Sequence, residues 1–121
     1  MSRPRIRAVP AIKNTVLVVD DQSTGRAILE EVVQSIDATI AVQAFESPLD
    51  AVRWATTHPA DLGLVDYQMP EIDGIDTIRE IRKTGACRDL PIIAVTAKAM
   101  KGDREKCIEA GAWDYLSKPV E

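Results

Sequence analysis

Short apolar runs alternate with longer amphipathic segments along most of the 121-residue chain. Runs of four to six residues that are rich in Val, Ile and Leu are typical of buried strands. The runs that we interpret as strands are TVLVV (15–19), TIAVQA (39–44), DLGLV (61–65), PIIAV (91–95) and WDYL (113–116). Since a segment long enough for a helix separates each run from the next, the pattern predicts alternating strands and helices.

The first two intervening segments have the features of capped helices. Ser23, a residue type that caps helix N-termini, opens a helix that runs to about Ser35. Its apolar side chains recur at helical spacing and form one stripe, made of Leu29, Val32, Val33 and Ile36. Ser47 and Pro48 open a second helix through about Thr57, because proline is favoured in the first helical turn.

The last two intervening segments are also helical in pattern. After Gly74, IDTIREIRK carries isoleucine at helical spacing and predicts a helix that stops before Gly85. KGDREKCIEA (101–110) is mostly polar, and Gly111 stands where glycine commonly ends a helix. The order β-α-β-α-β-α-β-α-β predicts an α/β fold, a parallel sheet with helices on both faces. The chain stops at Glu121, where one more helix would be expected.

Polar residues follow four of the predicted strands. Asp20 and Asp21 follow the first strand, Asp66 the third, Thr96 the fourth and Lys118 the fifth. Each has an ordinary explanation alone, such as a helix cap, a turn residue or a solvated lysine. Because sites in open parallel sheets form beyond the carboxyl ends of the strands, the five together predict one functional site.

The three carboxylates predict a magnesium site. Mg²⁺ prefers oxygen ligands and is commonly held by one or two carboxylates together with phosphate oxygens. Asp21 and Asp66 are the expected direct ligands, and Asp20 binds directly or through water. A backbone carbonyl near Gln68 completes the protein's share of the ligands.

Phosphoryl transfer is the chemistry that this residue set favours. A carboxylate can act as a nucleophile and form an aspartyl phosphate, and Asp66 is the candidate because it stands centrally among the others. Lys118 supplies positive charge, and the Thr96 hydroxyl can donate a hydrogen bond to a phosphoryl oxygen.

Charge and cysteine content narrow the remaining classes. The net charge is −4, but residues 1–13 are basic, which leaves 11 basic against 19 acidic residues in the remainder. We expect a flexible N-terminal arm that is neither a signal peptide nor a nucleic-acid-binding segment. No stretch approaches transmembrane length. Cys87 and Cys107 form no CxxC pair and indicate free thiols of a cytoplasmic protein, and His58 lies in a predicted exposed loop.

Four segments carry a family resemblance: VVDDQ (18–22), LVDYQMPEIDG (64–74), PIIAVTA (91–97) and YLSKP (115–119). In their order and separation they resemble response-regulator receiver domains of two-component signalling, similar to chemotaxis regulators, over about residues 14–120. The resemblance implies a flavodoxin-like, doubly wound five-stranded sheet in the order 2-1-3-4-5. It also implies phosphotransfer from a histidine kinase or a histidine phosphotransfer domain, to a signalling module that is not itself an enzyme.

The resemblance also implies roles for single residues. Asp66 is the phosphoacceptor, Asp20 and Asp21 are the acidic pair, and Lys118 and Thr96 are the lysine and the switch hydroxyl. Tyr115 matches the aromatic switch position, although a core-packing role is equally consistent with its sequence context. Gln68 and Lys98 match positions that tune how fast the phosphoryl group is lost to water.

The absent last helix is the main departure from this family. We expect a receiver domain over 14–121 that ends before its fifth helix, either cut from a longer protein, covered by the N-terminal arm, or completed by another chain. Residues 94–120 particularly resemble receivers of hybrid histidine kinases, which favours the first account. An uncovered apolar face predicts that the chain self-associates or is only marginally stable.

Three other functions fit parts of the sequence. A receiver-like scaffold that does not use phosphate would keep the fold, but it would not need the acidic, threonine and lysine positions. QSTGR (22–26) is weakly similar to a flavin-phosphate loop, yet Asp20 and Asp21 would repel that phosphate. An aspartyl phosphatase of the haloacid-dehalogenase type would require a second Asp where Gln22 stands.

Overall fold

The computed structural model describes residues 14–67 and 74–118, and in these ranges strands and helices alternate as the pattern predicts. The strands are β1 (Thr15–Val19), β2 (Ala41–Phe45), β3 (Leu62–Asp66), β4 (Ile92–Thr96) and β5 (Asp114–Ser117). The helices are α2 (Ser23–Ile36), α3 (Pro48–Ala55), α4 (Gly74–Arg82) and α5 (Asp103–Ala110). The predicted arm of residues 1–13 lies outside the described residues.

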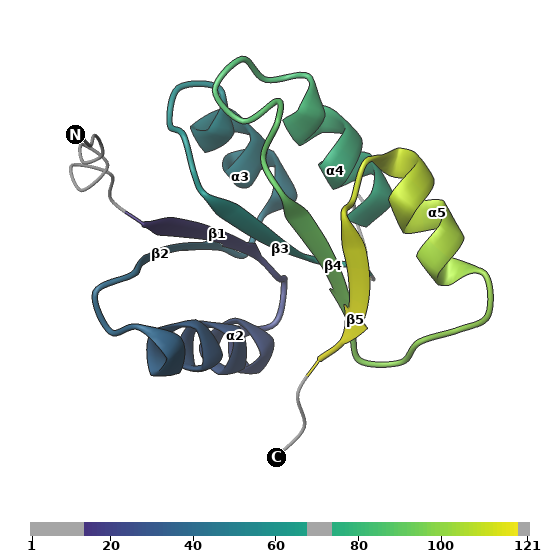
Figure 1. Cartoon of the computed structure of the whole chain (residues 1–121), viewed down its shortest axis with the longest axis horizontal. Helices are drawn as coiled ribbons and strands as arrows, with labels where there is room; N and C mark the ends of the chain where they lie inside the picture. The colour runs from purple at the N-terminus through teal and green to yellow at the C-terminus, as the bar shows by residue number, and fades with distance from the viewer. Residues whose placement is uncertain (1–13, 68–73, 119–121) are drawn as a thin grey trace, which may run out of the picture.

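The five strands form one parallel sheet in the order β2-β1-β3-β4-β5, which confirms the predicted doubly wound α/β fold (Figure 1). Helix α2 lies on one face of the sheet, and α3, α4 and α5 lie on the other. This order places β1 and β3 side by side, in register from Val16 opposite Leu62 to Val19 opposite Val65. The carboxyl ends of β1 and β3 therefore meet at one edge of the sheet.

Strand β1 shows how the two layers share one sheet. Leu17 and Val19 pack among the residues of α3, α4 and α5, whereas Val16 and Val18 pack against α2. All four side chains are buried, because successive side chains of a strand point to opposite faces and both faces are covered here. The continuous apolar run of β1 is thus the pattern of a central parallel strand.

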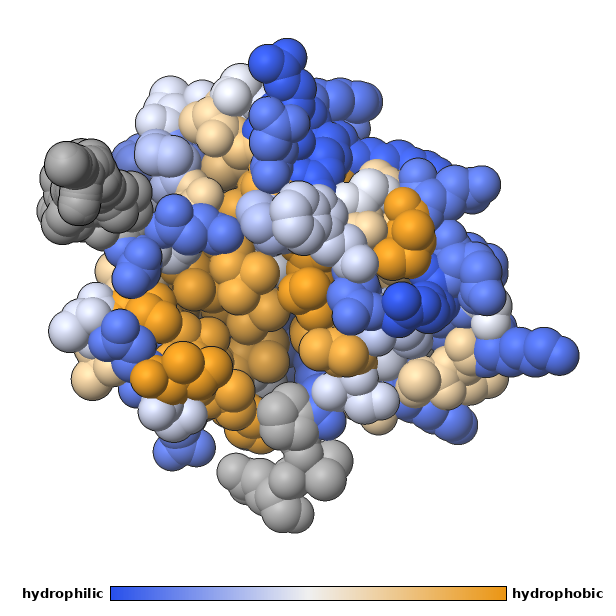
Figure 2. Space-filling model, viewed as in Figure 1, coloured by the Kyte–Doolittle hydropathy of each residue, from blue (hydrophilic) through white to orange (hydrophobic). Residues whose placement is uncertain are grey.

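In residues 14–67 and 74–118, the sheet face that bears α2 is less completely covered than the other. Beside the residues that pack against α2, this face presents apolar side chains that are only partly buried or are exposed. We call the residues Leu62, Leu64, Ile93 and Leu116 the open apolar face. Leu116 belongs to it because it pairs in register with Val95, which packs on the α2 side. Figure 2 shows apolar surface over the sheet beside α2.

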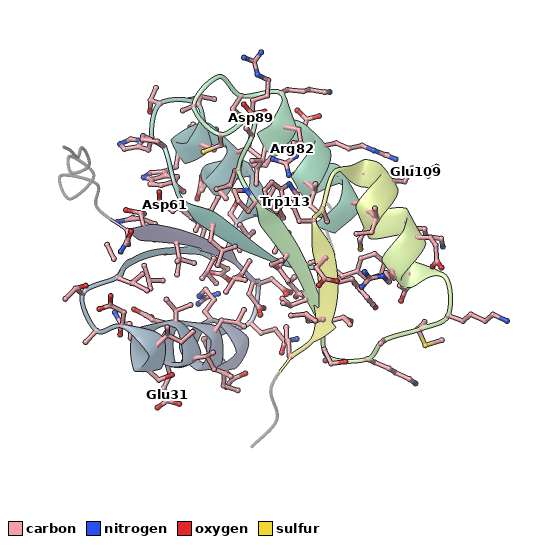
Figure 3. All side chains as sticks on the ribbon, in the orientation of Figure 1. Glu31, Asp61, Arg82, Asp89, Glu109 and Trp113 are labelled. Carbon is pink, nitrogen blue, oxygen red and sulfur yellow. The ribbon has the colours of Figure 1, made fainter. Side chains whose placement is uncertain are left out.

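Arg82 joins the α4 end of the molecule to the turn that precedes β5 (Figure 3). Its Nη2 and Nε donate to the backbone carbonyl of Gly111 at 2.6 and 3.2 Å, and its Nη1 donates to the carbonyl of Arg88 at 3.0 Å. Burial lowers the pKa of Arg82. The guanidinium nevertheless remains charged, and it ties three segments of the chain together.

Two predicted features of α2 are wrong. Ser23 is the first helical residue rather than the cap, since Gln22 occupies the cap position and no side chain caps this helix. In the predicted stripe, Leu29 and Val33 are buried, but Val32 is 39% and Ile36 is 77% exposed. Ile36 ends the helix, where no neighbouring helix lies over it among the described residues.

The other helix ends agree better with the sequence. The Ser47 hydroxyl accepts a hydrogen bond from the Asp50 N–H at 3.3 Å, and Pro48 begins α3 as predicted. Gly111 ends α5 with φ 122°, a conformation that favours glycine. Helix α5 begins at Asp103, two residues later than predicted, because Gly102 has the left-handed φ of 89°. In the described part of the chain, no helix is long and apolar enough to cross a membrane.

Candidate functional site

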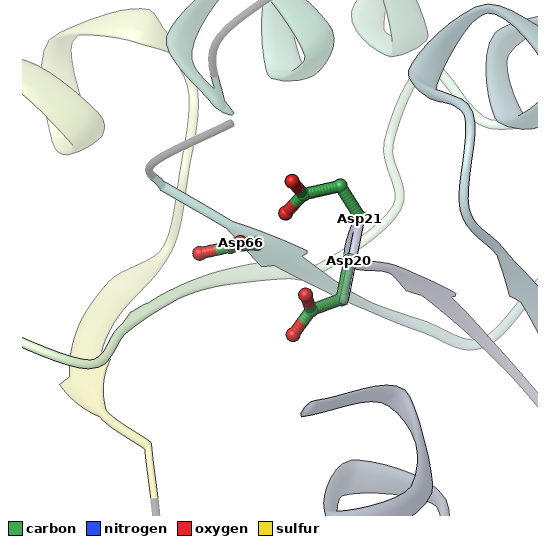
Figure 4. A group of neighbouring side chains, drawn as sticks. All are labelled: Asp20, Asp21 and Asp66. Carbon is green, nitrogen blue, oxygen red and sulfur yellow. The ribbon is translucent and has the colours of Figure 1, made fainter. Parts of the chain in front are cut away.

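Three carboxylates converge where β1 and β3 end (Figure 4). Asp20 and Asp21 follow β1, and Asp66 is the last residue of β3. Each offers an oxygen, and these oxygens all lie within 4.8 Å of one another. Asp20 is fully buried and Asp66 is 3% exposed, so their negative charges are largely removed from water. The predicted acidic cluster is therefore assembled by the adjacent strands.

The Lys118 ammonium lies beside two of these carboxylates. Its Nζ is 2.8 Å from Asp20 Oδ2 and 3.6 Å from Asp66 Oδ1, and its side chain is 16% exposed. The backbone fixes this position, because the Lys118 N–H donates to the Thr96 carbonyl at 2.7 Å. The ammonium thus contacts two of the three carboxylates, and a cluster of three negative charges favours a further cation.

Backbone groups and one glycine hold Asp20 in place. The Gln22 N–H donates to Asp20 Oδ1 at 2.9 Å, and Arg26 Nη1 donates to the Asp20 carbonyl at 2.8 Å. A Cβ at Gly25 would lie only 2.3 Å from Asp20 Oδ2. The first turn of α2 can therefore approach the buried carboxylate only with a glycine at this position.

Gly74 has a similar role beside Asp66. A Cβ at Gly74 would lie 2.5 Å from the Asp66 carbonyl oxygen, and the Gly74 N–H donates to the Tyr67 carbonyl at 3.1 Å. The start of α4 thus packs directly on the backbone that carries the central carboxylate. Close backbone approach, rather than positive φ, explains the glycine here.

Thr96 is the last residue of β4 and is fully buried. It directly follows Val95, which pairs with Asp66 of β3. Its Oγ1 accepts a hydrogen bond from the Lys98 N–H at 3.2 Å and donates to the Lys98 carbonyl at 3.2 Å. The Lys98 residue itself is exposed. In this structure the predicted switch hydroxyl is therefore bonded to the loop after β4.

Tyr115 is buried, 9% exposed, in the core between the sheet and α5. Its hydroxyl donates to Asp103 Oδ2 at 3.1 Å, and the Tyr67 hydroxyl donates to Asp103 Oδ1 at 3.0 Å. Burial and then the bond to Asp103 raise the pKa of Tyr115, and the same causes raise the pKa of Tyr67 to about 12. Both hydroxyls are consequently protonated donors at neutral pH.

Sequence reasoning predicted the residues that converge at this edge of the sheet but missed those that support them. The sequence analysis did not identify Gly25, Tyr67 or Asp103 as supporting residues. The available signals were weak: Gly25 is four residues after Asp21, and Asp103 directly follows a glycine. Their roles depend on distances between separate elements, which no local pattern reveals. The predicted carbonyl ligand and tuning residue Gln68 lies outside the described residues.

Comparisons with known proteins agree with this geometry. Residues 16–121 match the family described as the response regulator receiver domain. The cyclic di-GMP phosphodiesterase response regulator RpfG of Xanthomonas campestris is 38% identical over 105 residues, which are 87% of this chain and 28% of RpfG. The signal transduction histidine-protein kinase BarA of Escherichia coli is 40% identical over 111 residues, 88% of this chain and 11% of BarA.

A solved structure extends the agreement to three dimensions. The receiver domain of sensor histidine kinase PA1611 from Pseudomonas aeruginosa, which has a magnesium ion coordinated in its active site cleft, is 36% identical with a TM-score of 0.77. The match covers 91% of this chain and 88% of that one. The chain spans less than a third of either RpfG or BarA. By its matched sequence, strand order and acidic edge, the chain belongs to the response regulator receiver domain family of two-component signalling.

Proposed function

We propose that this receiver domain accepts a phosphoryl group on Asp66 from a histidine of a partner protein, with Mg²⁺, and that phosphorylation alters its partner-binding surface. The partner is a histidine kinase or a histidine phosphotransfer domain, and the chain acts as a phosphorylated signalling module rather than as an enzyme. The observation that carries this proposal is the convergence of Asp20, Asp21 and Asp66 beside the Lys118 ammonium.

In the proposed transfer, an Asp66 carboxylate oxygen forms a bond to phosphorus while the phosphorus–nitrogen bond to the partner's histidine breaks. The imidazole leaves with the electron pair of that bond, and the proton on its other ring nitrogen keeps it neutral. Lys118, 3.6 Å from Asp66 Oδ1, is close enough to stabilise negative charge on the phosphoryl oxygens. Phosphotransfer thus relies on positioning and charge neutralisation.

The donor set suits a magnesium ion, because carboxylate oxygens are the ligands that Mg²⁺ prefers. Asp20, Asp21 and Asp66 would hold it, together with the backbone carbonyl expected at Gln68. When bound, the ion supplies positive charge to the phosphoryl oxygens. The PA1611 receiver holds a magnesium ion in its active site cleft, and the similarity of this chain to that domain supports the same assignment here.

The switch in this proposal consists of Thr96 and Tyr115. A phosphoryl group on Asp66 offers the Thr96 hydroxyl a charged acceptor in place of the Lys98 carbonyl, and charge-assisted hydrogen bonds are the stronger kind. The loop after β4 and the surface of α5 and β5 would change as Thr96 turns. Lys98 and Gln68 would tune the loss of the phosphoryl group to water.

The remaining assignments concern the environment of the domain. The similarity to BarA, a histidine-protein kinase, supports a place in a hybrid kinase or phosphorelay of the cytoplasm. The open apolar face supports a second kind of interaction, in which two copies of this chain associate through that face. The acidic balance after residue 13 argues against nucleic acid, and we assign no membrane partner.

The proposal is tested by intact-mass spectrometry after incubation with acetyl phosphate. We expect one phosphoryl addition that requires Mg²⁺ and disappears in Asp66→Asn. Asp89→Asn is the matched control, because it removes an exposed carboxylate far from the acidic cluster. A folded protein that gains no phosphoryl group with Mg²⁺ would contradict the proposal and favour a scaffold that does not use phosphate.

A further inference from the structure

Two tyrosines, one directly after β3 and one in β5, donate to one buried carboxylate. Tyr67 and Tyr115 are the chain's two tyrosines, and their hydroxyls bond separate oxygens of Asp103 at 3.0 and 3.1 Å. The rings pack edge to face with centroids 5.8 Å apart. Asp103 is 7% exposed, so this carboxylate has exchanged water for protein donors.

A third donor completes the surroundings of this carboxylate. The Met100 N–H donates to Asp103 Oδ2 at 3.1 Å, in addition to the Tyr115 hydroxyl. Asp103 also lies in the first turn of α5, where the helix dipole favours negative charge. Hydrogen bonds to a charged group are about twice as strong as those between two neutral groups. The three donors should therefore hold the Asp103 carboxylate firmly in this position.

The cluster connects the segments that the proposed switch uses. Tyr67 directly follows Asp66, and its N–H donates to the Val95 carbonyl at 2.7 Å, next to Thr96. Tyr115 lies on β5, which pairs with β4 in register from Ile93 opposite Asp114 to Thr96 opposite Ser117. Asp103 therefore binds, through two hydroxyls, both the residue after the phosphoacceptor and the residue at the switch position.

We infer that Asp103 is a positioning residue that holds Tyr115 in its buried position and couples it to Tyr67, before any phosphoryl group is present. The buried position of Tyr115 is then a property of the resting domain, set from α5. That this arrangement serves the switch rests on the proposed function, whereas the positioning itself does not.

The position of Tyr115 can be measured without phosphate. The full chain labelled with ¹³C at tyrosine Cζ gives two signals, which Tyr67→Phe and Tyr115→Phe assign. A soluble gadolinium chelate broadens the signals of exposed rings, so it reports ring burial at neutral pH. We expect Asp103→Asn to raise the paramagnetic relaxation of the Tyr115 signal about twofold or more, because the ring then populates an exposed position.

Glu105→Gln is the matched control. It removes one negative charge from the same first turn of α5, but Glu105 is exposed and touches neither tyrosine. We expect wild-type relaxation in this variant, and Asp103→Glu should partly restore burial because it keeps a carboxylate. A Tyr115 signal as protected in folded Asp103→Asn as in the wild type would overturn the inference.

A second variant covers the case in which Asp103→Asn does not fold. Tyr67→Phe keeps the ring and removes one donor to Asp103, so the Tyr115 relaxation should rise by less than in Asp103→Asn but above the wild type. No rise would refute the coupling between the two tyrosines. Since these measurements use neither Mg²⁺ nor a phosphodonor, they can fail while Asp66 phosphorylation succeeds, or the reverse.

Discussion

The charge balance around Asp20, Asp21 and Asp66 determines what this edge of the sheet can bind. Three carboxylates lie together, the Lys118 ammonium contacts two of them, and Asp20 has no exposed surface through which water could screen its charge. The Lys118 ammonium lies nearer to Asp20 than to Asp66. In the proposed function, Asp66 is the carboxylate on which a bound cation and an incoming phosphoryl group would act.

Magnesium should stabilise the folded chain through this cluster. A ligand that binds only the native state at ten times its dissociation constant adds about 1.4 kcal/mol to the free energy of unfolding. We expect the melting temperature to rise with Mg²⁺ in the wild type and in Asp89→Asn, but not in Asp21→Asn. Scanning calorimetry with and without EDTA measures this, and an equal rise in Asp21→Asn would contradict the assigned ligands.

Gly25→Ala should weaken metal binding although alanine favours helices. In a helix interior, replacing glycine by alanine usually raises the free energy of unfolding by about 0.5–1 kcal/mol. At this position, however, its Cβ would lie 2.3 Å from Asp20 Oδ2 and would displace the buried carboxylate. We expect Mg²⁺ affinity, measured by calorimetric titration, to fall about tenfold or more, the effect typical of displaced metal-site support.

Gly85→Ala provides the comparison, because a Cβ there has no heavy atom within 4 Å. It should leave Mg²⁺ affinity unchanged. If both alanine variants bind Mg²⁺ as the wild type does, the close contact between Gly25 and Asp20 is not a requirement of the site.

At the scale of elements, the α4–α5 side of the molecule depends on polar connections as well as on apolar packing. Helix α5 buries only Asp103, Cys107 and Ala110, a small apolar contribution for two turns. Arg82 compensates by joining the end of α4 to the carbonyl that closes α5 at Gly111. The helix that carries Asp103 is thus fixed at its first turn by tyrosines and at its last by an arginine.

Arg82→Met should destabilise the domain without affecting the acidic cluster. The substitution leaves the Gly111 carbonyl without its two side-chain donors. A hydrogen bond to a charged group contributes about 1.5–3 kcal/mol to the free energy of unfolding. We expect a loss of that order in the free energy of urea unfolding. Arg79→Met, whose exposed side chain pairs with Asp76 at 4.0 Å, should cost well under 1 kcal/mol, as the loss of a surface ion pair does. Equal losses in both variants would show that the Gly111 bonds add nothing.

The elements were predictable because their signals are local. The unbroken apolar run of β1 predicted its bounds, and Ser47-Pro48 predicted the start of α3. Strand ends then brought Asp20, Asp66 and Lys118 together by topology alone. The exposure of Ile36 and the tyrosine pair on Asp103 were not predictable, because they depend on what packs across from each residue in the folded chain.

For the molecule as a whole, the two faces of the sheet differ in their cover. Among the described residues, α3, α4 and α5 pack on one face and only α2 packs on the other, and Leu116 of the open apolar face is 52% exposed. Exposed apolar surface on a sheet is a site of association. The 121-residue chain should therefore associate through this face in solution.

Leu116→Glu should reduce that association. A carboxylate on the open apolar face would have to be desolvated on contact with a second copy, which is costly. We expect the wild-type weight-average mass in sedimentation equilibrium to rise with concentration, and the rise to diminish in Leu116→Glu. Ile108→Glu, on α5 and 40% exposed, is the control and should behave as the wild type. A wild-type mass that stays monomeric at every concentration would rule out association.

The central claim is that Asp66 itself carries the phosphoryl group, and borohydride mapping tests it most directly. Borohydride reduces an aspartyl phosphate to homoserine, so peptide sequencing by mass spectrometry locates the modified residue after treatment with acetyl phosphate and Mg²⁺. We predict homoserine at position 66 and at neither position 20 nor 21. Homoserine at either neighbouring aspartate, with Asp66 unmodified, would contradict the account.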